Sequence, residues 1–452
     1  MRPGIGPIAD LARLAQLRAD VAARPQDLIA RHNLAVELRK ADRSEEGLAE
    51  IQRAWAGGLR VGETALMRAN LLADLGRFDE AVAAYRETAR IKPELADSHI
   101  VLANLLPQLD RADPPLASFD EALRRVPGSG PLWAQAYASA SASGSHAQLL
   151  DWTAQALRHW GPDATICTYR AMALSGLDRD AEAQAQIAEV AKAHPDFAAG
   201  QVTRAHILLK AGDPKTAAEA ALVAVRSEPA HQAAWALLST AWRLLGDPRE
   251  DWLCDYEKLV MSIDIAVDEA LGPVLEQRHQ TASHPPDQSL RGGTQTRGNL
   301  FETRDPVILA LATQLRDAIE ARLLDLPRDP QHPFLARNTG RIAFPTSWSV
   351  RLRSAGNHVS HVHPLGWMSS AFYIALPDEV TEGTGQGCLT FGVPDAALGL
   401  DLPPRRVVQP QEGRLVLFPS YLWHGTTPFE SAQARLTVAF DMLPVDNSPS
   451  GS

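Results

Sequence analysis

A period of about 34 residues runs through the first half of the chain. Gly or Asp recurs at equal steps, at Asp42, Gly76, Asp110, Gly144, Asp178, Gly212 and Gly246. Prolines keep the same period at Pro93, Pro127, Pro195 and Pro229, and Gly161-Pro162 fills the missing place. Gly and Asp tolerate the left-handed turns between helices, and proline ends a helix. The period therefore predicts a repeated pair of helices joined by a tight turn.

Small residues mark the positions where these helices pack closely. Alanine recurs in one register at Ala54, Ala122, Ala156 and Ala224. The period and this pattern resemble the tetratricopeptide repeat, a helix–turn–helix unit that stacks into a superhelix. About seven units are expected over residues 1–255, beginning near residues 28, 62, 96, 130, 164, 198 and 232.

An array of this kind has two common uses. It can be a scaffold or dimerisation surface, or it can offer an extended groove to a peptide. Asn70 and Asn104 occupy equivalent positions in neighbouring units, and an asparagine amide can bond a peptide backbone through both its oxygen and its nitrogen. The array therefore predicts a protein or peptide partner and leaves the oligomeric state open.

Composition limits the partners and the cellular location that can be expected for this protein. The net charge of −10 argues against nucleic acid as the main partner, because phosphate binding relies on clustered Lys and Arg. The three cysteines, Cys167, Cys254 and Cys388, are too few and too far apart for a disulfide framework. No apolar run is long enough to cross a membrane as a helix, and the N-terminus lacks a secretory pattern. A cytoplasmic location without membrane association is expected.

The pattern changes from about residue 340 onward. Short apolar runs such as WSVRL, AFYIAL, CLTF, RLVLFP and RLTVAF alternate with Gly, Pro and Asp, which is typical of strands joined by turns. A helix near 304–325 and a loop at 281–299 precede them. The expected organisation is a repeat array (1–255), a connecting helix and loop (256–300), a strand domain (301–445) and a disordered tail (446–452).

Histidines gather in the strand domain. His361 and His363 are two residues apart, so a strand would place both imidazoles on one face. His424 lies far downstream of this pair, just after a hydrophobic run, and Arg435 follows at the start of the next apolar run.

This arrangement resembles the iron(II)/2-oxoglutarate-dependent oxygenases, whose fold is a double-stranded β-helix, or jelly roll. In that family an H-x-D/E pair and a distal His ligate iron, and an Arg about ten residues later binds the far carboxylate of 2-oxoglutarate. The segments SLRGGTQTRGNLF, HVHPLGWMSSAFYIALP, GCLTFG, LVLFPSYLWHGTTPF and RLTVAF further resemble a bacterial subgroup that is often fused to tetratricopeptide repeats. The resemblance covers residues 280–444.

The resemblance implies a role for each matching residue. Fe(II) would be held by His361, His363 and His424, with no separate catalytic residue, and O2 and 2-oxoglutarate would be cosubstrates. The 2-oxoglutarate would be bound by Arg435, Tyr373 and Thr437. Substrate contacts are expected from Arg291, Gln295, His358 and Trp367. The alternatives are a purely structural Tyr373, a core Trp367 and an ordered linker at 281–299.

One position departs from the family pattern, because His363 stands where the family has a carboxylate. His363 is expected to be the third ligand, since its spacing aims it at the same face as His361. It could instead stand aside while water fills the place, or the site could have lost turnover.

The predicted function is an Fe(II)/2-oxoglutarate-dependent dioxygenase that hydroxylates a protein or peptide recruited by the array. Deleting residues 1–250 is then expected to spare metal binding, 2-oxoglutarate binding and slow succinate formation without substrate, unless the last repeat packs an apolar face onto the helix at 304–325. One alternative is a three-His iron dioxygenase independent of 2-oxoglutarate, against which Arg435 argues. The other is a non-catalytic, repeat-based interaction protein.

Overall fold

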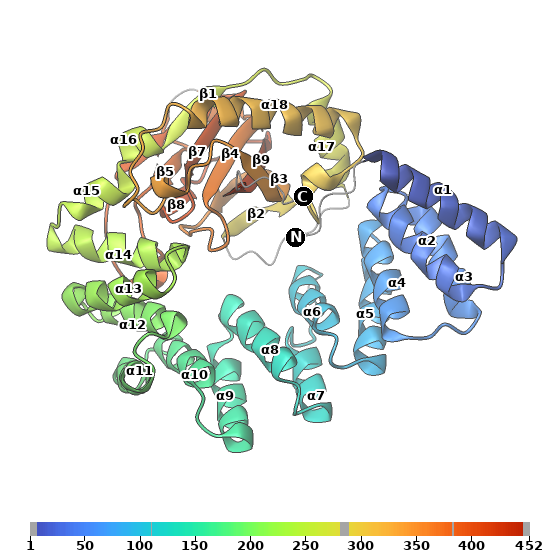
Figure 1. Ribbon diagram of the computed structural model, residues 1–452, viewed down its shortest axis with the longest axis horizontal. Coiled ribbons are helices and arrows are strands. Elements are labelled where there is room, and N and C mark those ends of the chain that lie inside the picture. Colours follow the sequence, from blue (N-terminus) through green and yellow to red (C-terminus); the bar gives the residue numbers. More distant parts are fainter. Residues whose placement is uncertain (1–6, 110, 281–288, 382–383, 446–452) are drawn as a thin grey trace, which may run out of the picture. The chain divides into compact units, whose positions relative to one another are not determined.

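The computed structural model describes residues 7–109, 111–280, 289–381 and 384–445 (Figure 1). The predicted tail at 446–452, the first part of the predicted loop and Asp110 lie outside the described residues. The chain forms two compact units. The first contains residues 1–139, 277–286 and 302–306, and the second contains residues 140–276, 287–301 and 307–452.

Helices fill the first half of the chain, as the period predicts. They are α1 (Pro7–Ala23), α2 (Leu28–Lys40), α3 (Ser44–Ala56), α4 (Gly62–Asp74), α5 (Phe78–Ile91), α6 (Ala96–Gln108), α7 (Ala117–Arg125), α8 (Gly130–Ala142), α9 (His146–Trp160), α10 (Ala164–Gly176), α11 (Asp180–Ala193), α12 (Ala198–Lys210), α13 (Pro214–Ser227), α14 (Gln232–Leu245), α15 (Arg249–Cys254) and α16 (Tyr256–Leu259). The even-numbered helices from α2 to α14 begin at the predicted unit starts. The repeat array is confirmed.

The periodic residues occupy the turn and packing positions that the sequence predicts. Positive φ angles occur at the described turn positions, between 56° at Asp42 and 77° at Gly212. The four periodic alanines are buried between helices. A side chain larger than that of alanine would separate the helices at these points, so the period reflects both turn geometry and packing.

The second half contains antiparallel sheets, as a jelly roll requires. The strands are β1 (Met261–Asp264), β2 (Leu290–Gln295), β3 (Ile342–His358), β4 (Met368–Ala375), β5 (Leu389–Phe391), β6 (Arg406–Val408), β7 (Arg414–Pro419), β8 (His424–Thr426) and β9 (Arg435–Pro444). Among the described residues they form a six-stranded sheet, ordered β1-β7-β4-β9-β3-β2, and a three-stranded sheet, ordered β6-β5-β8. The remaining elements are α17 (Leu271–His279), α18 (Pro306–Leu323), α19 (Asp378–Thr381) and the 3-10 turns η1 (Leu300–Glu302), η2 (Leu335–Arg337) and η3 (Ala396–Leu398).

The segment 256–300 differs from its prediction as a connecting helix and loop. Besides α17 it supplies β1 and β2, the two edge strands of the large sheet. The sequence of β2, LRGGTQ, is poor in strand-forming residues because of its two glycines. Its pairing with β3, from Leu290↔His358 to Gln295↔Val350, makes it a strand, so tertiary pairing overrides local preference.

The last repeats and the sheets share one hydrophobic core within the second unit. This core runs without interruption from Ala198 in α12 to Met442 in β9. Tyr421 donates a hydrogen bond to the carbonyl oxygen of Leu253 at 2.7 Å, and Arg405 pairs with the buried Glu250 at 2.8 Å. The hydrophobic core therefore continues across residue 255, where the sequence predicts the end of the repeat array. Deleting residues 1–250 would remove part of the core on which the strand domain packs.

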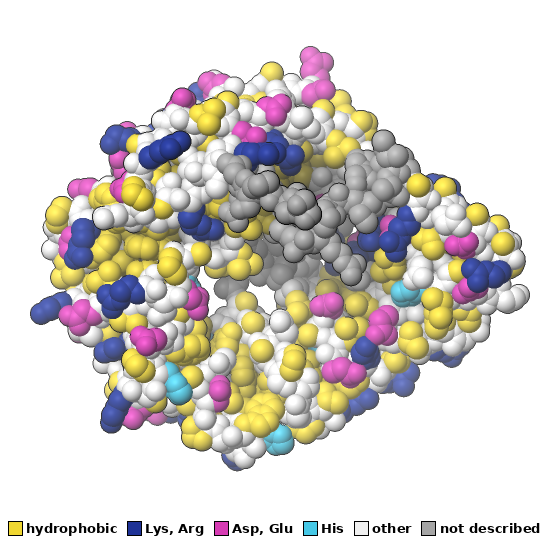
Figure 2. Space-filling view, viewed as in Figure 1, with side chains coloured by type: hydrophobic (Ala, Val, Ile, Leu, Met, Phe, Trp, Pro, Cys, Tyr) yellow, Lys and Arg dark blue, Asp and Glu magenta, His cyan; other side chains and the backbone are white. Residues whose placement is uncertain are grey.

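The surface carries charges of both signs. On the face drawn in Figure 2, basic and acidic side chains are interspersed and no single basic patch dominates. Among the described residues, no helix combines the length and apolar composition needed to cross a bilayer.

Candidate metal centre

Main-chain hydrogen bonds hold the three predicted ligands in place. His424 begins β8, and His361 and His363 lie between β3 and β4. The amides of His361 and His424 each donate to the other's carbonyl oxygen, at 3.0 and 3.1 Å. The amide of His363 donates to the carbonyl oxygen of Ser420 at 3.0 Å. The three backbone positions are therefore fixed by the fold.

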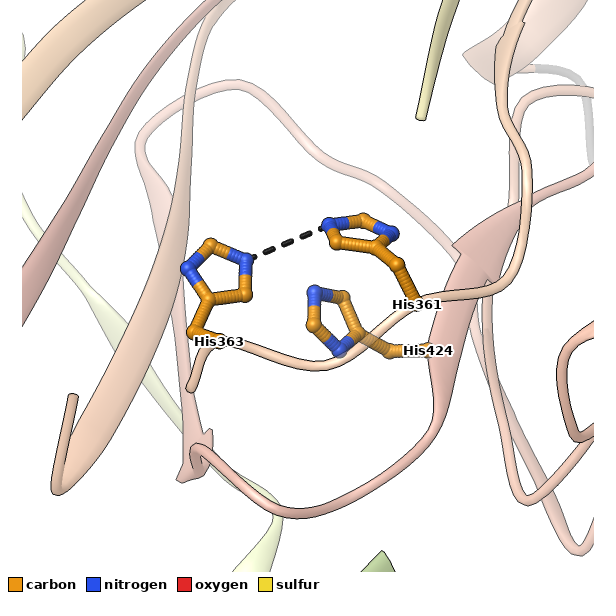
Figure 3. A group of neighbouring side chains, drawn as sticks. All are labelled: His361, His363 and His424. Atoms are coloured by element: carbon orange, nitrogen blue, oxygen red, sulfur yellow. Dashed lines mark hydrogen bonds between the residues drawn. The ribbon is translucent and has the colours of Figure 1, made fainter. Parts of the chain in front are cut away.

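The three imidazoles converge on one point (Figure 3). One ring nitrogen from each lies within 4.8 Å of the others. The Nε2 atoms of His361 and His363 are 3.2 Å apart. Two nitrogens that bind one ion at right angles, each about 2.1 Å from it, lie about 3 Å apart. The spacing of these nitrogens therefore fits a shared metal ion.

The opposite nitrogen of each ring meets an oxygen. The Nδ1 atoms of His361 and His424 donate to the carbonyl oxygens of Val359 and Leu422, both at 2.9 Å. The Nδ1 atom of His363 lies 2.7 Å from Oδ1 of Asp441. Because these oxygens only accept, each Nδ1 carries the proton and the lone pair of a neutral ring is on Nε2. The rings thus present their ligating nitrogens to the shared point.

Electrostatics favour a neutral ring at His424. Burial, together with the neighbouring His361 and His363, holds the pKa of His424 well below its usual range. Neutral imidazole is the form that binds a transition metal.

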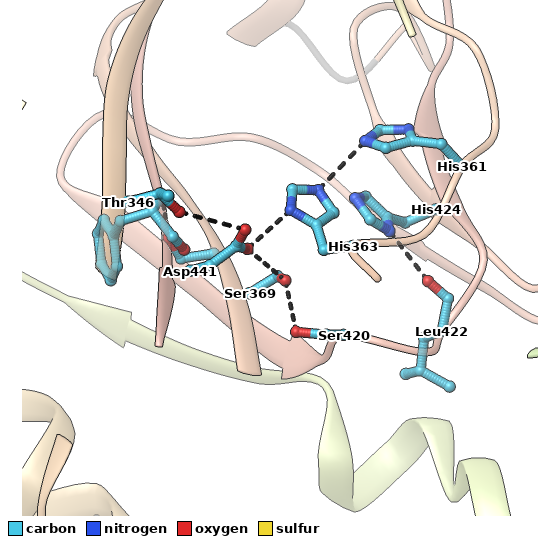
Figure 4. A network of polar contacts seen from close by, with 10 residues as sticks. Thr346, His361, His363, Ser369, Ser420, Leu422, His424 and Asp441 are labelled. Carbon is cyan, nitrogen blue, oxygen red and sulfur yellow. Dashed lines mark hydrogen bonds and ion pairs between the residues drawn. The ribbon is translucent and has the colours of Figure 1, made fainter. Parts of the chain in front are cut away.

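Asp441 is a functional candidate that the sequence reasoning missed. It comes from β9 and accepts from Ser369 Oγ at 2.7 Å and from Thr346 Oγ1 at 3.4 Å, besides contacting His363 (Figure 4). Burial raises the pKa of Asp441, but His363, Ser369 and Thr346 outweigh it and the net shift is downward. A same-face signal was present, because Arg435, Thr437 and Asp441 are separated by even steps in RLTVAFD.

Arg435 and Tyr373 form a buried polar pair with open hydrogen-bonding capacity. The Arg435 guanidinium lies 5.0 Å from the centre of the Tyr373 ring, and its Nη1 donates to the carbonyl oxygen of Gly387 at 2.8 Å. Within the described residues, Nε of Arg435 and the hydroxyl of Tyr373 are buried and have no hydrogen-bond partner. Such groups are costly to bury unpaired, and a carboxylate would satisfy both.

Thr437 and Gln295 share the sheet face of Tyr373. Tyr373 pairs with Thr437, Thr437 with Val350, and Val350 with Gln295, so the four residues form one row across four strands. The Oε1 atom of Gln295 is buried without a partner among the described residues. Arg291 is exposed and donates to the carbonyl oxygen of Leu290 at 3.1 Å. The substrate roles of Gln295 and Arg291 stay predictions.

His358 lies beside the three predicted metal ligands. It is the last residue of β3, and its ring centre is 6.0 Å from that of His361. The chain leaves the strand between His358 and His361, so the two rings can approach each other, and the substrate role of His358 stays a prediction. Burial is the main cause that keeps the pKa of His358 well below its usual range, and the neighbouring imidazoles and Arg435 add to it.

Trp367, a predicted substrate contact, is buried in the core. Its side chain is 1% exposed, stacks on Phe334 with ring centres 4.7 Å apart, and donates to the Phe334 carbonyl oxygen at 3.0 Å. These contacts make Trp367 part of the core, which was the alternative reading of the sequence.

Comparisons with known proteins match each half of the chain separately. Residues 346–441 match the family described as "Putative 2OG-Fe(II) oxygenase". This stretch contains the three histidines, Tyr373, Arg435, Thr437 and Asp441. The resemblance predicted from the sequence is confirmed there, over a shorter stretch than the expected 280–444.

Two solved structures are similar to the repeat array. A tetratricopeptide repeat protein from Parabacteroides merdae is 19% identical, with 52% of this chain and 92% of that chain covered and a TM-score of 0.32. YrrB, described as a TPR protein with an unusual peptide-binding site, is 17% identical, with 48% of this chain and 95% of that chain covered and a TM-score of 0.27. No curated protein was found to match the chain.

Proposed function

We propose that this protein is an Fe(II)/2-oxoglutarate-dependent dioxygenase that hydroxylates a protein or peptide recruited by the repeat array. One observation supports it most: three converging imidazole nitrogens occur in the same sheet domain as a buried arginine and tyrosine that have unpaired polar atoms. This combination offers ligands for the metal and donors for the far carboxylate of 2-oxoglutarate. The match of residues 346–441 supports the same chemistry.

The metal and 2-oxoglutarate, when bound, supply the oxidation: one oxygen atom of O2 enters the substrate as a hydroxyl, the other enters succinate, and CO2 leaves. The chain supplies orientation. Arg435 presents a planar, permanently charged donor, and Tyr373 adds a neutral hydroxyl donor beside it. Because both are buried, their hydrogen bonds form away from water, where they are stronger.

The three histidines hold the metal and set its electronic character. Each is oriented by an oxygen acceptor on Nδ1, which fixes the ring before any metal arrives. A facial arrangement of three ligands leaves positions for 2-oxoglutarate and O2.

Recruitment by the array rests on its repeat architecture. The Asn70 side chain is partly engaged within its own repeat, because its Oδ1 accepts from the Tyr85 hydroxyl at 2.6 Å. A peptide contact at this position would therefore fall to the Asn70 amide nitrogen. Several stacked units offer a long surface on which many modest contacts add up.

Succinate release tests this function against its two alternatives. The full chain is loaded anaerobically with Fe(II), then given O2 and 2-oxoglutarate, with and without cell lysate. We expect succinate that increases with lysate and is lost in His424→Ala, whereas His159→Ala, an exposed histidine on α9, is the matched control. Oxidation without 2-oxoglutarate would favour the three-His dioxygenase. No oxidation at all would favour the interaction protein.

A further inference from the structure

His363 is held by a carboxylate on the side opposite the metal point. Its Nδ1 is 2.7 Å from Oδ1 of Asp441, while its Nε2 faces the Nε2 of His361. Figure 4 shows the ring standing between the two. Asp441 is therefore one imidazole away from the point where the three histidines converge.

Charge distinguishes this ligand set from one with a carboxylate. A divalent ion bound by two neutral histidines and a carboxylate keeps a net charge of +1. The same ion bound by three neutral histidines keeps a net charge of +2. This difference changes the protein's affinity for the ion and the ion's affinity for further ligands. A compensating negative charge close to the third histidine would restore the balance.

We infer that Asp441 is a positioning residue that supplies this missing negative charge to the metal through His363. The inference rests on the proposed function, because it presupposes a metal bound by the three histidines. A carboxylate that accepts from the far nitrogen of a ligating histidine fixes its tautomer and raises its basicity. Asp441 thus supplies negative charge to the metal through one hydrogen bond, whereas a carboxylate ligand supplies it directly.

The surroundings of Asp441 hold the carboxylate in this role. Asp441 pairs with Thr346 on one neighbouring strand and with Ser369 on the other, and both hydroxyls donate to it. Ser369 also contacts the hydroxyl of Ser420 at 2.8 Å, and the Ser420 carbonyl oxygen accepts from the His363 amide. One network therefore orients both the carboxylate and the histidine.

Trp348 fixes the remaining freedom of the ring. Its ring centre lies 5.8 Å from that of His363, and the two planes are only 14° apart. The face of the His363 ring lies parallel to Trp348, and its Nδ1 atom contacts Asp441. These two contacts orient the ring so that Nε2 points to the shared metal position.

A neutral replacement of Asp441 separates the effect of its charge from the effect of its shape. Asp441→Asn keeps the size of the side chain and an oxygen that can accept from Nδ1, but it removes the charge. Titration of the metal-free full chain with Co(II), without 2-oxoglutarate, measures the effect by visible absorbance. We expect Asp441→Asn to weaken Co(II) binding about 10- to 100-fold, as for other residues that support a ligating histidine. Asp317→Asn, which removes the charge of an exposed aspartate on α18, is the matched control and should change affinity by less than about threefold.

A double-mutant cycle excludes a merely structural role. His363→Asp places a carboxylate in the ligand position, so the charge of Asp441 becomes redundant. In that background Asp441→Asn should leave Co(II) affinity within about threefold, or raise it. Thermal unfolding of each metal-free variant checks the fold, and Asp441→Ser, a second neutral acceptor, replaces Asp441→Asn if that variant unfolds.

The possible outcomes separate this inference from the proposed function. If the unaltered chain does not bind Co(II), both the metal centre and the inference are overturned. If the unaltered chain binds Co(II) and the neutral variant binds it equally well, only the inference is overturned. An equal loss in both backgrounds also overturns it, because the effect would then not pass through His363.

Discussion

The indole Nε1 of Trp423 donates to Oγ1 of Thr240 at 3.0 Å, which joins the last repeat to the residue directly before His424. The same nitrogen lies 3.1 Å from the carbonyl oxygen of Ala236. Arg243, also on α14, donates to the carbonyl oxygen of Gly392 at 2.6 Å, and the Gly392 amide donates to the carbonyl oxygen of Trp423 at 2.8 Å. Helix α14 thus supports the main chain that carries one of the proposed metal ligands.

Truncation should therefore depend on where the cut falls. Deleting residues 1–250 removes α14 and much of the shared core, so the remaining sheet domain should be insoluble or unfold at a lower temperature. Deleting residues 1–139 leaves α14 and that core in place and should be much better tolerated. Soluble yield and thermal unfolding of both truncates check this, and a stable sheet domain after the longer deletion would contradict it.

The Trp423–Thr240 contact should contribute measurably to stability. Thr240→Val keeps the shape of the side chain but removes the hydroxyl, so the free energy of unfolding should fall by about 0.5–1.5 kcal/mol. Urea unfolding measures this difference. Thr313→Val, at an exposed threonine on α18, is the control and should have a smaller effect. An unchanged value for Thr240→Val would show that the contact is energetically neutral.

Metal binding should stabilise the chain through the three histidines. At a Co(II) concentration of 100 times the dissociation constant, the linkage between binding and folding predicts a gain of about 2.7 kcal/mol. A chelator should reverse the accompanying rise in melting temperature. His424→Ala should abolish the rise, whereas His159→Ala should keep it. A rise that persists in His424→Ala would place the metal elsewhere.

Arg435 should control affinity for 2-oxoglutarate. Arg435→Lys keeps the charge but loses the planar donor, and losing a charge-assisted hydrogen bond of about 1.5–3 kcal/mol corresponds to a loss of about ten- to a hundredfold in affinity. Calorimetry on the Co(II)-loaded chain measures it, with Co(II) affinity as the internal control. Unchanged 2-oxoglutarate affinity in Arg435→Lys and Arg435→Ala would remove this assignment.

Tyr373 allows stability and binding to be separated. Its buried hydroxyl has no partner among the described residues, so Tyr373→Phe should leave the ligand-free chain equally stable or slightly more stable. The same change should weaken 2-oxoglutarate binding, because one donor is lost. Urea unfolding and calorimetry on the same preparation test both parts. A clear loss of stability with unchanged binding would make Tyr373 a structural residue of the sheet.

Much of the fold could be predicted because it depends on local or periodic constraints. The turn at Gly76 and the packing of Ala54 follow from requirements that recur along the array, so several units supply the same evidence again. The strand β2 carries no such signal. Its glycines favour a loop, and only its pairing with β3 makes it part of the sheet.

The candidate site was predictable to a similar extent. His361 and His363 are two residues apart and His424 follows a hydrophobic strand, so residue type and spacing single them out. Asp441 lies far from His363 in the chain, and nothing local links the two. Trp367 had two interpretations from the sequence, a substrate contact or a core residue, and its packing against Phe334 favours the second.

The sequence by itself determined the repeat period, the change from helices to strands and the identity of the three histidines, because these are encoded in residue type and short-range spacing. Only the tertiary structure decided that Asp441 contacts His363, that β1 and β2 complete the large sheet, and that α14 contacts the chain before His424. Each of these depends on pairing between segments far apart in the chain. Such pairing is selected by burial and hydrogen bonding over the whole fold, and no local pattern records it.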